Sequence, residues 1–375
     1  MKKLIYILVL IIMSFSSFSQ EKVQFKGQLS AVTSYNPNNY LGWFAGARYI
    51  PEASYKTPLQ TNNSFNFLAS ADVSSSVSFR PFNASIDNAD LDAYRIWARY
   101  ATENYELRVG LQKIDFGSAS LLRPLQWFNQ IDPRDPLRLT NGVQALLGRY
   151  YFADNTNIWL WMLSGNDKTR GSDVFKTDTN SIEFGGRLQL PIAKGELAFS
   201  YHHRTANVSS LQMFPFDEIA ENRIGIDAKV DITVGFWVEA THNQKSKNVG
   251  LYTNQTLITT GADYTFGISN GLNVVAEHLV STFDEKAFAF KNTNQTSALS
   301  INYPLGLFTS ISAMYYQHWN EKQQTALVNI EHQFEKITSY FMLYYNPEQQ
   351  QTIQQNDLTQ SFSGAGIRIM LVYNH

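Results

Sequence analysis

Charged side chains occur at alternate positions of strand-like segments, on the side opposite the apolar residues. In the segment 104–113, Leu107 and Val109 share one parity and Arg108 has the other, which is the period of a strand with one apolar and one polar face. The arginines of the polar parity are Arg95, Arg99, Arg108, Arg149 and Arg187, and the acids are Glu239, Asp263, Glu277 and Glu331. Where such faces enclose water, fixed charges of both signs discriminate between solutes.

A long connection, residues 114–141, separates two of these segments. It contains three prolines, Phe128 and the candidate site residues Asp115, Arg123, Trp127, Asp132, Arg134, Asp135 and Arg138. Hairpin loops usually contain a few residues, so we expect this one to fold inward as a packed unit. Two roles stay open. Either the loop narrows a passage and its charges select solutes, or its charges pair with the wall and only fix the loop.

Two short motifs in this connection have structural and functional interpretations. The run from Asp132 to Pro136 places two aspartates among prolines, and such residues form rigid turns by accepting nearby backbone N–H groups. Carboxylates also bind calcium, but turn formation is the favoured interpretation. Trp127 and Phe128 are expected to pack the loop against the wall, in preference to stacking on a sugar ring.

Enzymatic chemistry finds little support in the sequence. A hydrolase would need a serine, a histidine and a third orienting group within reach of one another. His202 and His203 point to opposite faces of one strand, and His242 and Ser246 belong to no recognisable motif. The chain has seven dispersed histidines and no cysteine. We therefore predict no enzymatic activity, no cofactor and no metal site.

The first residues have the pattern of an export signal. Lys2 and Lys3 precede an apolar run from Leu4 to Met13, and small residues follow at Ser17 and Ser19. That run is shorter than the roughly 20 residues that span a bilayer as a helix, so a cleaved signal peptide at residues 1–19 is favoured over a retained anchor. The mature chain is then predicted to be a single domain, residues 20–375.

The remainder consists of about eighteen alternating segments joined in turn by short and long connections, with sixteen as the other count considered. The first runs from 23 to 35, the fourth from 90 to 100 and the last from 361 to 373. Aromatic residues make up 14% and charged residues 17% of the chain, a balance suited to aromatic girdles at membrane interfaces. A soluble sandwich also alternates, but so many amphipathic strands would leave a large apolar surface to cover. We predict an all-β, antiparallel, up-and-down transmembrane β-barrel.

One stretch resembles a known family. The residues from Leu107 to Gly117 read LRVGLQKIDFG, and the proline-aspartate run follows at 131–136. This pattern of an R-x-G-x-Q strand, a glycine turn and a proline-aspartate loop is similar to the outer-membrane barrels grouped with alginate-export proteins and related porin-like channels. The resemblance implies an eighteen-stranded barrel and diffusive passage of a polar solute, and it covers about 50 residues.

These observations predict a porin-like channel in the outer membrane of a Gram-negative bacterium, selective through the 114–141 loop and the lumen charges. A hydrophobic-compound transporter and a structural or adhesin-like surface barrel are the alternatives. The expected partners are outer-membrane lipid and lipopolysaccharide, the barrel assembly machinery during biogenesis, and a polar solute. The net charge of −2 gives no reason to expect nucleic acid, and the sequence specifies no oligomeric state.

Overall fold

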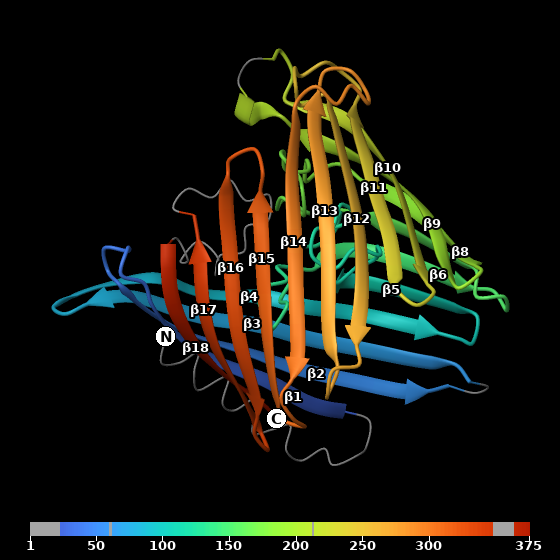
Figure 1. Cartoon of the computed structure of the whole chain (residues 1–375). Coiled ribbons are helices and arrows are strands. Elements are labelled where there is room, and N and C mark those ends of the chain that lie inside the picture. Colours follow the sequence, from blue (N-terminus) through green and yellow to red (C-terminus); the bar gives the residue numbers. More distant parts are fainter. Residues whose placement is uncertain (1–22, 60–61, 212–213, 348–363) are drawn as a thin grey trace.

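The computed structural model describes residues 23–59, 62–211, 214–347 and 364–375; the predicted signal peptide lies outside them. Within these residues eighteen strands form one sheet, and each strand pairs antiparallel with the next along the chain, as β4 does with β5. The last strand returns to the first, from Gln28 opposite Asn374 to Tyr35 opposite Ile367. The sheet is therefore closed (Figure 1), as predicted.

The strands are β1 (Val23–Tyr35), β2 (Trp43–Pro58), β3 (Ser64–Arg80), β4 (Asn83–Ala101), β5 (Tyr105–Gln112), β6 (Val143–Tyr151), β7 (Asn157–Leu163), β8 (Glu183–Ile192), β9 (Gly195–Asn207), β10 (Glu218–Asp231), β11 (Gly235–Lys245), β12 (Asn254–Phe266), β13 (Leu272–Asp284), β14 (Thr293–Pro304), β15 (Thr309–His318), β16 (Gln323–Gln333), β17 (Ile337–Asn346) and β18 (Gly364–Asn374). One short 3-10 turn, η1 (Ser209–Leu211), precedes β10. No helix in the described residues has the length and apolar character needed to cross a membrane.

The alternation of each strand separates an apolar outside from a polar inside. On β10, Ile224 is 53% exposed whereas its neighbour Arg223 is 1% exposed. On β5, Leu107 and Val109 point outward and Glu106 is buried. An outer surface of this kind matches hydrocarbon, and the closed ladder leaves few backbone groups unpaired. The predicted assignment of faces is confirmed for these strands.

The longest described connections lie at one end of the barrel. Residues 102–104, 193–194 and 334–336 are short turns at the end where β1 begins and β18 ends, and residues 113–142 and 164–182 are the longest described connections at the other. One boundary differs from expectation. Residues 83–89, which were expected to belong to a loop, continue β4 because they pair with the serine-rich end of β3. Only Pro81 and Phe82 remain as the turn.

The connection between β5 and β6 enters the ring of strands, where it is visible as the teal and green coil behind β12–β14 (Figure 1). This confirms the inward fold predicted for residues 114–141. The largest buried apolar cluster therefore lies inside the barrel, between this loop and the inner faces of β6 and β7.

Candidate functional site

Three carboxylates from the barrel wall hold the first half of the 114–141 loop. Glu277 of β13 accepts the backbone N–H groups of residues 120, 121 and 122, with donor–acceptor distances of 2.7, 3.0 and 2.5 Å. Glu239 of β11 accepts those of Ala119 at 2.9 Å and Leu125 at 2.5 Å. Asp227 of β10 accepts the Ser118 hydroxyl at 3.1 Å. We call Asp227, Glu239 and Glu277 the carboxylate clasp.

The clasp needs a close approach between backbone and wall. Gly117 has φ +108°, and a Cβ there would lie 2.5 Å from the Glu239 Oε2 atom. Only glycine adopts this positive φ and leaves room for the Glu239 carboxylate without strain. Glu277 also accepts the indole N–H of Trp237 at 3.0 Å, and the Thr259 hydroxyl donates to the Leu122 carbonyl at 2.7 Å. Each carboxylate of the clasp therefore accepts hydrogen bonds from the loop, as buried polar groups require, and Asp227 is also paired with Arg187.

An aromatic core fixes the other side of the same loop. Phe116, Trp127 and Phe128 pack with Trp161 of β7, and Trp127 and Phe128 are 1% and 2% exposed. Phe116 stacks on Trp161 with ring centroids 5.6 Å apart. Since Trp127 and Phe128 are enclosed, they have the packing role expected from the sequence and offer no ring face to a sugar.

The tip of the loop is built from turns. Asp132 pairs with the Arg134 guanidinium at 2.8 Å and accepts the Arg134 backbone N–H at 2.9 Å. Asp135 accepts the N–H groups of Leu137 and Leu139 at 3.0 and 3.2 Å. No cluster of potential metal ligands occurs in the described residues. The turn-forming role predicted for these aspartates agrees with this geometry.

Two aspartates of the loop have opposite pKa shifts. Burial raises the pKa of Asp135 above its ordinary value, and the two N–H donors only partly offset this. Burial also disfavours the charged form of Asp115, but its partners together outweigh burial and lower the pKa of Asp115, the Arg123 guanidinium 2.7 Å away contributing most. Lys113 and Asn129 add to the lowering.

The predicted basic residues of the early strands are largely engaged in ion pairs. Arg99, Arg108 and Arg149 surround one buried carboxylate, Glu106, at 2.8, 2.8 and 3.9 Å. Three guanidinium groups on one carboxylate leave a local excess of positive charge.

Four other predicted site residues lie apart from that cluster. Arg95 donates to the Thr140 carbonyl at 2.7 Å, and Arg187 pairs with Asp227 at 2.5 Å. Asp263 pairs in register with Gly235 of β11, and no hydrogen bond joins it to the loop among the described residues. The exposed Arg138 has φ +46° at the loop tip.

A second inward loop, residues 164–182, was not predicted. Its Asp173 pairs with Arg204 at 2.9 Å and Arg223 at 2.6 Å, and all three side chains are almost fully buried. It also meets the first loop, because a Cβ on Gly171 would lie 1.9 Å from the Gln126 carbonyl oxygen. The sequence does contain an indication that an acidic segment enters the lumen. Arginines on the inward faces of β9 and β10 require acidic partners if they are buried.

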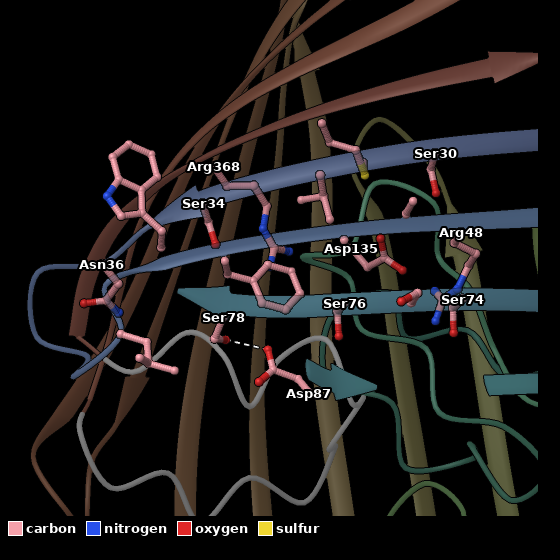
Figure 2. A pocket seen from close by; sticks show the side chains of 18 of the residues that line it. Ser30, Ser34, Asn36, Arg48, Ser74, Ser76, Ser78, Asp87, Asp135 and Arg368 are labelled. Carbon is pink, nitrogen blue, oxygen red and sulfur yellow. Dashed lines mark hydrogen bonds between the residues drawn. The ribbon is translucent and has the colours of Figure 1, made fainter. Parts of the chain in front are cut away.

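A cavity of about 520 Å³ lies on the opposite side of the lumen. Its wall is formed by the inward faces of β1–β4 and β18, and the loop tip at residues 135–137 borders it. Figure 2 shows its hydroxyl groups with Asp87, Asp135, Arg48 and Arg368 around them. The serines on its lining are Ser30, Ser34, Ser74, Ser75, Ser76 and Ser78.

The residues that line the cavity differ from the site residues predicted from the sequence. Among the site residues predicted from the sequence, Asp135 alone lies on the described lining of the cavity. The alternating serines of β3, with Arg48 paired to Asp72 at 3.0 Å, are not among the site residues predicted from the sequence, because serine has neither a charge nor an aromatic ring. Their signal was available: serines at 74, 76 and 78 share the inward parity of β3.

Comparison with known proteins supports the fold. No family model matches the chain, and no curated protein matches it in sequence. Among solved structures, OmpF of Salmonella typhi, in complex with daunomycin, is 11% identical with a TM-score of 0.52, covering 94% of this chain and 97% of its own. OccD3 of Pseudomonas aeruginosa is 9% identical with a TM-score of 0.57, covering 94% and 91%.

A third neighbour is Wzi of Escherichia coli, described as an outer membrane protein involved in group 1 capsule assembly and a carbohydrate-binding β-barrel. It is 9% identical with a TM-score of 0.55, and the match covers 97% of this chain and 87% of that one. At these identities the likeness establishes a shared closed-barrel fold.

Proposed function

We propose that this protein is an outer-membrane channel of a Gram-negative bacterium through which small or oligomeric polar solutes diffuse. The observation that carries the proposal is the division of the lumen. Two inward loops occupy one side, and a cavity lined by hydroxyl and charged groups borders the loop tip on the other. Water-filled passages of transmembrane barrels have polar linings of this kind.

The proposed passage follows the inner face of β1–β4 past residues 135–137. In this scheme the 114–141 loop narrows the lumen as a fixed element, since the clasp and the aromatic core hold it. Selectivity would come from the width left beside the loop tip and from the nearby charged groups, among them Asp135, Arg48 and Arg368. The neighbouring porin structures are consistent with this proposal, as is the family resemblance of the segment 107–117.

The proposal is tested by measuring the conductance of two cysteine variants, one with its thiol on the inner face of the barrel and a control with its thiol on the outer face. The chain has no cysteine, so Ser74→Cys places a single thiol on the inner face of β3. Val73→Cys places one on the outer face, where Val73 is 43% exposed. In planar bilayers we expect discrete current steps, reduced when a charged thiol reagent modifies the inner cysteine and unchanged when it modifies the outer one. A silent bilayer, or equal effects at both positions, would refute the channel.

A second candidate is a saccharide-binding barrel that conducts poorly. The observations in its favour are that both inward loops, residues 114–141 and 164–182, fill part of the lumen, and that one structural neighbour, Wzi, is described as a carbohydrate-binding β-barrel. Conductance separates the two candidates. A binding barrel without a passage would give saccharide-dependent protection of the Ser74→Cys thiol but no current steps.

A further inference from the structure

Among the residues that the structure describes, the outer half of β4 is paired on one side only and has a free edge on the other. β4 pairs with β3 along Asn83–Ala101, but β5 pairs only with Ile96–Ala101. No backbone hydrogen bond joins residues 83–95 to any described segment except β3. In Figure 1 the β3–β4 hairpin is the element that extends furthest to the left, beyond the neighbouring strands. One row of N–H and C=O groups is therefore open to pairing.

The side chains of this edge strand are sorted by face. Ile86 and Leu91 point outward and are 77% and 69% exposed. They lie opposite Val77 and Val73 of β3. Asp90 and Asp92 lie on the inner face, opposite Ser74 and Asp72. An added strand would continue the apolar outer surface and the polar inner surface at once, with main-chain bonds supplying the affinity.

Charge determines which strand fits. Asp72 is neutralised by Arg48 at 3.0 Å, whereas no cation in the described residues lies within ion-pair distance of the exposed Asp90 or Asp92. Two copies of β4 paired edge to edge would bring these carboxylates into one ladder, and like charges opposite each other are destabilising. A strand with lysine or arginine opposite Asp90 and Asp92 would instead be stabilised by cross-strand charge pairs.

Lipid does not fit this edge either. Acyl chains offer no hydrogen-bond partner, and each unpaired backbone group in hydrocarbon costs several kcal/mol. We propose that residues 83–95 of β4 receive an extended segment of a partner protein as an added strand. That segment has lysine or arginine on the face that meets Asp90 and Asp92, and apolar side chains on the face that continues Ile86 and Leu91.

The probe is a short peptide that alternates lysine with valine, added to the full-length barrel in detergent. We expect saturable binding by fluorescence anisotropy, and slower hydrogen exchange confined to residues 83–95. Asp90→Asn should weaken binding about threefold to fivefold, which corresponds to the loss of one cross-strand charge pair. Glu321→Gln, which removes an exposed acid from the β15–β16 turn at the same end, should leave the affinity unchanged.

Three controls decide the outcome. A peptide with glutamate in place of lysine, and a lysine–valine peptide methylated at every backbone nitrogen, should not bind. Equal binding by either one, or the absence of exchange protection in residues 83–95, overturns the proposal. Ala89→Cys provides a single thiol on this edge, and disulfide-linked dimers formed without peptide would assign the edge to a second copy and overturn the basic partner. None of these measurements depends on conductance.

Discussion

The carboxylate clasp predicts that one substitution, Glu277→Gln, loosens the 114–141 loop without disturbing the wall. The side chain is 3% exposed and accepts five hydrogen bonds, three at Oε1 and two at Oε2. Glutamine has nearly the same shape but a single acceptor oxygen. Its NH₂ group would face the N–H groups of Leu121 and Leu122, or those of the donors at the other oxygen.

The magnitude follows from the bonds lost. Hydrogen bonds to a charged group contribute about 1.5–3 kcal/mol each, and a buried donor left without a partner costs about as much. With two bonds lost, docking of the loop weakens by about 3 kcal/mol. The undocked fraction then rises about 100-fold. Glu239 and the aromatic core still hold the loop, so we expect more frequent local opening of a folded barrel.

Single-channel recording and hydrogen exchange measure this opening. Glu277→Gln should add transient conductance levels to the open current and speed exchange of the amides at residues 119–125. Glu331→Gln is the matched control, since it removes an acid on the inward parity of β16 that makes no described hydrogen bond or ion pair with the loop. If Glu277→Gln and Glu331→Gln behave alike in both measurements, the clasp does not position the loop.

Three further predictions address the loop and its surroundings. Arg108→Gln reduces the excess positive charge around Glu106, so reversal potentials should shift towards cation preference. Trp127→Ala empties a site that is 1% exposed; a loss of about 3–5 kcal/mol should appear as a lower melting temperature of the loop's near-ultraviolet circular dichroism. The pKa of Asp115 is lowered from its usual 3.8, so its stabilising contribution is present above that pH and is lost as the pH falls through the lower folded value. Acidification should therefore lower the protection factors of the loop amides, that is, the slowing of their exchange relative to the intrinsic rate at the same pH, and Asp115→Asn should remove this dependence.

The sequence was sufficient for the barrel because a strand's two faces are local information. Leu107 and Arg108 are neighbours, and their alternation indicates hydrocarbon on one side and water on the other wherever the strand lies in the ring. The β3–β4 hairpin shows the limit of such local evidence. Residues 83–89 are mostly small and include two asparagines and an aspartate, which are common in loops, yet their backbone pairing with β3 makes them a strand.

The clasp could not be predicted from the sequence, because it depends on which inward acids meet the loop. Glu277 and Glu331 have the same residue type and the same parity, and both count as lumen acids. The structure separates them by position in the ring: Glu277 reaches the amides of residues 120–122, and Glu331 does not. That difference comes from long-range packing of a loop that joins β5 and β6 but is held by β10, β11 and β13.

The inward residues of each strand nevertheless indicate on which side of the barrel the loop packs. On the first part of β6 these are Val143, Ala145 and Leu147, all almost fully buried, so the inner face of that part of the strand is apolar, as on a strand covered from that side. On β3 the inward residues include Ser74, Ser76 and Ser78. A barrel strand with an apolar inner face requires a covering segment, and one with a hydroxyl inner face tolerates water. Comparing the inward residues strand by strand therefore predicts that the lumen is filled beside β6 and β7 and open beside β1–β4. The buried core cluster lies on the first side and the cavity on the second.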